Sequence, residues 1–413
     1  MNGDQPAQVM QGIAVPATSV NAQAFYAHTR RQTLPFATGR AYGGLGSTDI
    51  VTALQTGIIA QLLVRVTGVV TTTLGTGTVA TTNQWPYGLA KQVRFTANGQ
   101  SNLINVPGVW LKAREMSRTT LNDRGVNRVA RIAQPAAAVN NGNAYQGTLS
   151  LANEVWGNST ANEAIGPEVT AIADDEYFFD ITYVVPIAFD AQTLVGSIFA
   201  QTQATELALS IDWANLSDLF VFTGTGTATV AATYSVEGIV YDIPQVGGQI
   251  VVPNLSMFHS YILTRNTAIS TGDNEYTLPG QGVGRQLMRI GFRTMNGTVP
   301  APLPLATPSI LTNAVAANYG NIGWRYGGNQ TPDLFNTGRE LATWNERTFG
   351  CDFSSLWGMG WLDFSVDSAL RDSVNEGTAT QLRLLYNLNT GLTLTGAFSE
   401  IVQETLFGAA AGG

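Results

Sequence analysis

Residues 177–190 read YFFDITYVVPIAFD, residues 191–200 read AQTLVGSIFA, and residues 205–214 read TELALSIDWA. From Tyr177 to Phe189 every second residue is apolar, and Asp180 falls between two of them. A period of two places the apolar side chains on one face of a β-strand. The same alternation returns from Leu207 to Trp213. We therefore expect two strands, each with one buried face.

The segment between these strands has the pattern of a short helix. Asp190 stands where an N-cap residue would, and Leu194 and Ile198 follow at helical spacing. A strand, a helix and a strand in succession usually indicate a parallel α/β sheet. A doubly wound fold, however, needs this unit to be repeated along the chain, and the sequence does not repeat it in that way.

The arrangement returns once, near the C-terminus. WLDFSV alternates, Asp367 could cap a second helix over SALRDSV, and alternation resumes over residues 382–388. Two further pairs of segments resemble each other in the same order. QLLVRVTGVV from Gln61 resembles QLMRIGFRTM from Gln286, and TYSVEGIVYDI resembles LTLTGAFSEIV. Together these echoes predict two similar β-sandwiches in tandem.

The composition agrees with an all-β fold in two parts. The 413 residues are 44% hydrophobic and 12% charged, which is enough to build two domains. The 44 glycines and runs such as TGVVTTTLGTGTVATT favour strands and tight turns over helices. The segments that resemble each other are more widely spaced in the first copy than in the second, which predicts an insertion in the first copy. The expected parts are an N-terminal arm (1–48), a first sandwich (49–245) with an insertion at about 111–165, a second sandwich (246–405) and a C-terminal tail (406–413).

The residues that usually carry chemistry are sparse. The two histidines, His28 and His259, lie apart in sequence and are best explained as structural, and the single Cys351 as a small buried hydrophobe. The acidic run at 174–176 could hold calcium, although a solvated strand entry explains it better. We find no catalytic, metal or cofactor motif, so we expect no enzyme and no cofactor.

Arginine supplies most of the positive charge, and it gathers in two places. The net charge of −8 argues against a general nucleic-acid binder. Arginine suits fixed contacts at interfaces, although a coding bias would explain its excess over lysine equally well. Candidate contacts with other subunits or with a membrane are Arg114, Arg118, Arg124, Arg128 and Arg131 in one segment, and Arg30, Arg31 and Arg40 in the arm.

For the first arginine segment we favour acidic partners on a neighbouring subunit over nucleic acid, because no aromatic residue is interleaved for base stacking. For the arm, anionic lipid heads, adjacent subunits and plain solvation remain open. The arm shows no sustained period of two or of 3.6, so we expect residues 1–48 not to join a sandwich core. Removing residues 1–40 should then leave thermal stability nearly unchanged.

The order of four segments resembles a known family. IIAQLLVRVTGVVTTT, WPYGLAKQVRFTANGQ, the opening stretch and YSVEGIVYDIPQVGGQIVVPNLSMFHSYIL are similar to the double jelly-roll major coat proteins of tectiviruses, tailless icosahedral bacteriophages with a membrane beneath the shell. The likeness runs from about Ile58 to Glu404. It implies two tandem eight-stranded jelly rolls, each with a short helix between two strands. The insertion would form an outward projection.

The resemblance also implies a function. Such a protein would be a major capsid protein that forms pseudo-hexagonal homotrimers and tiles a shell. Its partners would be other copies of itself, penton and minor capsid proteins, and the internal membrane through the arm, with no sequence-specific nucleic acid. It would be assembled in the host cytoplasm and located in the virion, which agrees with the lack of a signal-peptide pattern at the N-terminus.

A carbohydrate-binding or receptor-binding β-sandwich protein of a phage is the alternative. The eight tryptophans could form a sugar-stacking face. Trp213 shares the apolar face of its strand, whereas Trp361 falls on the polar face and is the better candidate for exposure. Exposed tryptophans along a groove would favour this alternative.

Overall fold

The computed structural model describes most of the first half of the chain and the main strands of the second. The described residues are 9–10, 13–14, 18–53, 55–82, 84–97, 100–118, 128–131, 171–172, 176–190, 193–200, 206–278, 284–296, 299–301, 319–326, 333–335, 359–364, 374–375, 382–388 and 394–408. Within these ranges no helix is long and apolar enough to cross a membrane.

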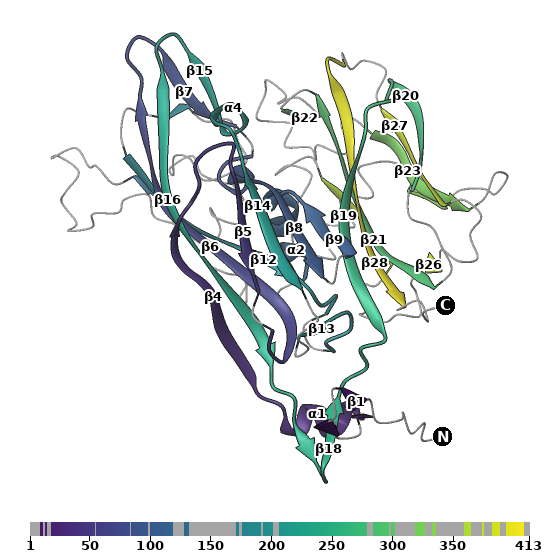
Figure 1. The fold of residues 1–413 in the computed structure, drawn as a ribbon. Coiled ribbons are helices and arrows are strands. Elements are labelled where there is room, and N and C mark those ends of the chain that lie inside the picture. The colour runs from purple at the N-terminus through teal and green to yellow at the C-terminus, as the bar shows by residue number, and fades with distance from the viewer. Residues whose placement is uncertain are drawn as a thin grey trace, which may run out of the picture.

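Two β-sandwiches lie side by side (Figure 1). The outer sheet of the first sandwich is antiparallel, with strands in the order β10 (Arg128–Arg131), β12 (Glu176–Pro186), β6 (Ile58–Thr73), β16 (Thr227–Tyr241) and β4 (Arg31–Ala41), and β13 (Ile198–Phe199) also pairs with β6. The facing strands are β5 (Thr48–Thr52), β14 (Leu207–Trp213), β8 (Ala90–Ala97) and β9 (Gln100–Val106).

The second sandwich continues the same inner sheet. Beyond β9 come β19 (Met257–Asn266), β28 (Ala397–Gly408), β21 (Arg285–Asn296) and β22 (Val299–Ala301), while β25 (Gly360–Asp363) and β26 (Val374–Asn375) also pair with β21. The opposing sheet holds β20 (Gly272–Thr277), β27 (Leu382–Leu388), β23 (Tyr319–Tyr326) and β24 (Asp333–Phe335). The pairing of β9 with β19 is parallel and joins the two sandwiches into one sheet.

Smaller elements close the ends. Three short sheets comprise β11 (Ala171–Ile172), β7 (Thr78–Thr81) and β15 (Phe220–Thr223); β17 (Gln245–Val246), β18 (Gln249–Val252) and β3 (Thr18–Val20); and β1 (Val9–Met10) with β2 (Ile13–Ala14). Within the described residues the helices are α1 (Ala22–His28), the 3₁₀ turn η1 (Tyr87–Leu89), α2 (Gly108–Arg118) and the single turn α4 (Leu216–Leu219).

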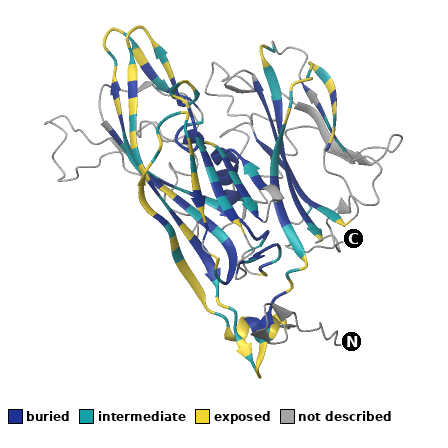
Figure 2. Ribbon diagram, viewed as in Figure 1, coloured by how far each residue is buried: buried dark blue, intermediate teal, exposed yellow. Residues whose placement is uncertain are grey.

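The strands with an alternating sequence each have one buried face, as the sequence predicts. In β12 the side chains of Tyr177, Phe179, Ile181 and their alternate successors are buried, and β14 follows a strict buried–intermediate alternation. In Figure 2 the buried residues concentrate in the middle of the long strands and in α2, and the exposed residues lie mainly along β4 and at the strand tips. The first sandwich and α2 share one large apolar cluster with a few residues of β19, β25 and β28, whereas β21, β27 and β28 enclose a separate core. The tandem sandwiches are therefore confirmed.

The sequence echoes also correspond to equivalent strands. β6 lies between β12 and β16, and β21 lies between β25 and β28. The segment from Gln61 lies in β6 and the similar segment from Gln286 lies in β21, so each forms the central strand of its three. The repeated three-strand arrangement is the physical basis of the repeated apolar pattern.

The short helix expected after Asp190 is absent from the described residues 193–200. They form a turn followed by β13, and Leu194 has a φ of 57°, outside the helical region. The Asp190 carboxylate accepts bonds from the backbone nitrogen and hydroxyl of Thr193, so it caps a turn. The corresponding helix after Asp367 falls outside the described residues.

The expected boundaries need two corrections. Residues 31–41 of the arm form β4, which pairs with β16 and places Ala37 in the core of the first sandwich. This strand has no clear period because it lies at a sheet edge, where only one small patch is covered. At the other end, β28 runs to Gly408, into the expected tail. Of the insertion at 111–165, residues 111–118 belong to α2, and most of the remainder falls outside the description.

Candidate functional site

Helix α2 lies between the two sandwiches and is buried on every side. Val109, Trp110 and the following residues to Met116 are all buried, including the charged Lys112, Arg114 and Glu115. A helix surrounded in this way must bury its polar face as well as its apolar one. We call the region between α2 and β9 on one side and β19, β21 and β28 on the other the seam. Its charged groups need partners inside the protein.

One buried carboxylate, Glu404 on β28, gathers charges from both sandwiches. Its Oε1 accepts a bond of 2.7 Å from Nε of Arg114 on α2 and also contacts Nη2 of that guanidinium. The same oxygen lies 3.0 Å from Nε2 of His259, while Nη1 of Arg289 lies 3.7 Å from Oε2. Glu404 is completely buried. The cluster therefore ties α2 to strands β19, β21 and β28.

His259 links the seam to the first sandwich. Its Nδ1 lies 2.9 Å from the carbonyl oxygen of Pro186, at the end of β12. Arg114 donates to the neighbouring carbonyl of Phe189 at 2.9 Å. Burial lowers the pKa of His259, although its hydrogen bond with Glu404 opposes this effect. A buried histidine with a partner at each ring nitrogen fits the structural role expected from the sequence.

A second buried carboxylate, Glu400, lies four residues before Glu404 on β28. Its Oε2 accepts from Nε of Arg293 at 2.7 Å and from the indole nitrogen of Trp110 at 3.0 Å, and its Oε1 lies 3.1 Å from Arg265. Burial alone would raise the pKa of Glu400, but the charges of Arg293 and Arg265 and the bond from Trp110 outweigh it and lower that pKa. The carboxylate is therefore held ionised.

Aromatic packing fills the space between the two carboxylates. The rings of Trp110 and Trp361 meet edge to face at 5.5 Å, and Arg289 lies over the Trp361 ring at 4.6 Å. Gly291 sits between the indoles, since a Cβ there would lie 2.6 Å from Cζ3 of Trp110. This close approach requires glycine. Arg289 also pairs with Asp363 on β25 at 2.7 Å.

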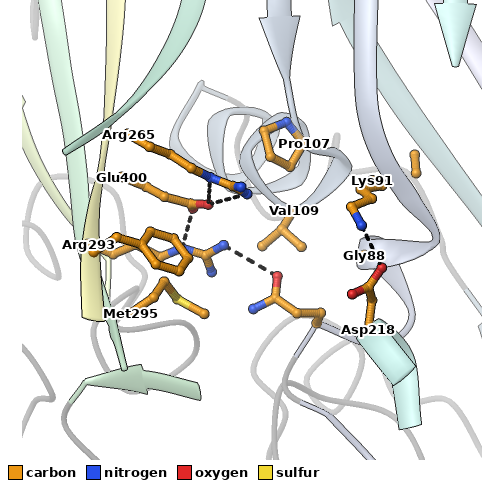
Figure 3. A pocket seen from close by; sticks show the side chains of 12 residues that line it. Gly88, Lys91, Pro107, Val109, Asp218, Arg265, Arg293, Met295 and Glu400 are labelled. Atoms are coloured by element: carbon orange, nitrogen blue, oxygen red, sulfur yellow. Dashed lines mark hydrogen bonds and ion pairs between the residues drawn. The ribbon is translucent and has the colours of Figure 1, made fainter. Parts of the chain in front are cut away.

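A pocket of about 230 Å³ opens where the seam reaches the surface. Figure 3 shows Arg265, Glu400 and Arg293 on one side of it, and Lys91 with Asp218 on the other. Lys91 and Asp218 form an ion pair of 2.9 Å. The pocket thus has one wall from each sandwich.

The arginines expected at contacts have different positions. Arg30, Arg31 and Arg40 are exposed, as a contact with another molecule requires. Arg40 donates to the backbone carbonyl of Ile50 at 3.3 Å and so connects the adjacent edges β4 and β5. Ile50 itself is 62% exposed, which is unusual for isoleucine.

For the other arginine segment, the prediction of a contact with a neighbouring subunit is wrong at Arg114. That side chain is buried in the chain's own interior and is paired with Glu404, so it cannot face a neighbouring subunit. The backbone of Arg118 ends α2, and Arg128 and Arg131 delimit β10. Their side chains and the whole of Arg124 lie outside the described residues, as do 174–175 of the acidic run and Cys351.

The expectation for Trp361 is also wrong. Trp361 is fully buried, although the strand pattern put it on a polar face. The reason is that its outer face is covered by α2 of the first sandwich, a contact that strand alternation cannot foresee. Trp213 is buried as expected.

Comparison with known proteins identifies the architecture. No protein-family model matches the sequence, and no curated protein does. Among solved structures, the STIV MCP has a TM-score of 0.60 with 11% identity, covering 91% of this chain and 96% of that one. A chain of the Sulfolobus Turreted Icosahedral Virus structure gives 0.58 with 11% identity, covering 91% and 90%. A chain of the PBCV-1 virus capsid gives 0.54 with 11% identity, covering 94% and 96%.

The chain is a double jelly roll. The likeness extends over both sandwiches and therefore includes their relative placement. At this identity it shows the fold alone, because the same fold can carry different functions. Within the double jelly roll, the seam is the feature that fixes the two halves against each other.

Proposed function

We propose that this chain is a viral major capsid protein that assembles as a homotrimer, with six jelly rolls forming a pseudo-hexagonal tile. The observation that carries the proposal is the double jelly roll over more than nine-tenths of the chain, shared with the STIV MCP and with a chain of the PBCV-1 virus capsid. The role is structural, and assembly needs no bond-making step.

The seam supports this proposal on physical grounds. A tile can meet several neighbours in register only if its two halves keep a fixed orientation. Here the continuous inner sheet and the buried clusters around Glu400 and Glu404 hold them together. Two domains joined only by a linker would be expected to move relative to each other.

The exposed arginines of the arm region are proposed contact residues. Arg31 and Arg40 lie at the two ends of β4, and Arg30 precedes it. Guanidinium groups bind carboxylates through two parallel hydrogen bonds, and a chain of net charge −8 offers such carboxylates on neighbouring copies. The internal membrane is the second proposed contact of this region. Arg118, Arg124, Arg128 and Arg131 remain proposed contacts with neighbouring subunits.

The finer parts of the proposal rest on the sequence resemblance. They are a tectivirus-type bacteriophage with an internal membrane, penton and minor capsid proteins as partners, assembly in the host cytoplasm, and no sequence-specific binding of nucleic acid. The carbohydrate-binding alternative is less well supported, because all four tryptophans whose burial the structure describes, Trp85, Trp110, Trp213 and Trp361, are buried.

Sedimentation of the purified full-length chain tests the proposal. We expect a single species of three times the 43.9 kDa chain mass at micromolar concentration. Exchange of Arg31 and Arg40 for glutamate should weaken this species or its assembly into larger particles. The matched control is Arg65→Glu, which alters an exposed arginine on the outer sheet. A wild-type protein that remains monomeric would contradict the capsid role.

A further inference from the structure

Residues 242–256 form the linker that connects the two sandwiches, from the end of β16 to the start of β19. Its two short strands, β17 and β18, pair with each other, and β18 also pairs with β3 of the N-terminal arm. Figure 1 shows α1 and β18 together at the lower end of the molecule, beyond the ends of β4 and β16. Two short paired strands are marginally stable by themselves. The linker therefore depends on the arm for its fixed conformation.

Residues 18–30 of the arm, which we call the clasp, bond to the linker at two places. β3 pairs in parallel with β18, and the backbone nitrogen of Asn21 donates to the carbonyl oxygen of Val252 at 3.2 Å. At the other end, the Thr29 hydroxyl donates to the carbonyl oxygen of Asp242 at 2.6 Å. The backbone nitrogen of Asp242 donates to the carbonyl oxygen of Arg30 at 3.0 Å. The clasp thus spans the linker from its first residue to β18.

One side chain anchors the middle of the clasp. Among the seven residues of α1, all of which the structure describes, only Phe25 is buried. Phe25 belongs to a small apolar cluster that is separate from the cores of both sandwiches. The cluster also contains Ile58 and Ala60 of β6, Leu194 of the turn before β13, and Val251 of β18. Phe25 therefore joins the clasp, the first sandwich and the linker at one point.

The clasp buries little besides this anchor. A helix of seven residues is too short to be stable alone. Tyr26, the next residue, is 42% exposed, and its hydroxyl donates to the carbonyl oxygen of Thr193 at 2.5 Å. A segment with few buried contacts opens locally at a lower free-energy cost than a sandwich core does. The clasp and the linker can therefore open together while both sandwiches stay folded.

We propose that residues 18–30 are a releasable clasp with Phe25 as its latch. In the closed state the clasp fixes the linker against the first sandwich. In the open state it frees β18 and exposes the apolar surface that Phe25 covers. The seam keeps the sandwiches together in both states, because the bonds of Glu400 and Glu404 involve no residue of the clasp or the linker. The proposal does not depend on a role in a capsid.

Hydrogen–deuterium exchange of the full-length chain, followed by mass spectrometry, tests the proposal. In the wild type, amides of the clasp and of β18 should exchange at one shared rate, faster than those of β12 and β14. Phe25→Ala should raise the exchange of both segments about tenfold or more and leave β12 and β14 unchanged, because it removes only the latch. Phe25→Leu should have a smaller effect. The matched control is Phe222→Ala on β15, which should leave the clasp and β18 at the wild-type rate.

Three results would overturn the proposal. Unrelated exchange rates for the clasp and β18 in the wild type would mean that they do not open as one unit. Unchanged exchange of β18 in Phe25→Ala would mean that Phe25 does not hold the linker. If Phe25→Ala fails to fold, or speeds exchange in β12 and β14 as much as in β18, then Phe25 belongs to the global core and is no latch.

Discussion

At the scale of single residues, the seam depends on carboxylates that cannot reach water. Glu404 is fully buried and contacts Arg114, His259 and Arg289. Removing one partner from such a cluster leaves the other charges buried without compensation. Surface ion pairs behave differently, because water already solvates both partners. Position in the fold, more than the number of ion pairs, therefore decides which charges matter for stability.

We expect Glu404→Gln to lower the free energy of unfolding by about 3–5 kcal/mol. The control is Asp180→Asn, which breaks the pair with the 62% exposed Arg65 and should cost about 1 kcal/mol or less. Chemical denaturation of the three proteins provides the comparison. Similar losses for the two variants would show that the seam cluster does not hold the sandwiches together.

The lowered pKa of Glu400 predicts an acid dependence of stability. Arg293 and Arg265 favour the ionised carboxylate in the folded state, so its stabilising contribution is complete above the usual glutamate pKa of 4.5 and is lost as pH falls below it. The free energy of unfolding, measured between pH 6 and 3, should therefore fall more steeply for the wild type than for Glu400→Gln. Parallel curves would contradict the assigned role of the two arginines.

At the scale of elements, local alternation was predictable and long-range contacts were not. The buried faces of β12 and β14 follow from the period of two in their own residues. The segment after Asp190 satisfied a helical spacing, but Gly196 and the pairing of β13 with β6 favour a turn and an extended chain there. Good helix formers after Pro107 could have revealed α2, whereas its role as a buried connection depends on strands nearly 300 residues away.

Strand β4 belongs to the first sandwich although its sequence does not alternate between apolar and polar residues. Only Leu34, Phe36 and Ala37 contact the first core, and Pro35 interrupts the run. The pairing of β4 with β16 nevertheless covers one edge of the outer sheet. We therefore replace the expectation that the arm is dispensable for the fold.

Truncation tests this revision. Removing residues 1–41 should lower the melting temperature by at least about 5 °C more than removing residues 1–30, because only the longer deletion eliminates β4 and exposes its core contacts. Scanning calorimetry of both proteins measures the difference. Equal melting temperatures would mean that β4 contributes nothing to the sandwich and that the boundary expected from the sequence at residue 48 is correct.

At the scale of the whole molecule, the two jelly rolls form one structural unit. The parallel contact of β9 and β19 extends the inner sheet across both, and Trp361 of the second sandwich belongs to the large core of the first. The sequence echoes identified the duplication, but they contain no information about how the copies meet. That arrangement depends on contacts of α2, Glu400 and Glu404 between the two copies, and the alternation within either copy does not predict such contacts.

A shared sheet and core should make unfolding cooperative. We expect one calorimetric transition whose van't Hoff and calorimetric enthalpies agree for the isolated chain. Glu404→Gln should lower the temperature of this transition without dividing it, because the shared sheet and core remain. Two independent transitions in the wild type would indicate that the jelly rolls are joined but not energetically coupled.

We propose that this double jelly roll is the tile of a viral shell. Cryo-electron microscopy of the full-length chain, expressed alone and purified, tests it most directly. We expect trimeric particles with a pseudo-hexagonal outline, into which three copies of the present fold fit with β4 and its arginines near a neighbouring copy. Particles that contain a single chain, or an assembly without threefold symmetry, would contradict it.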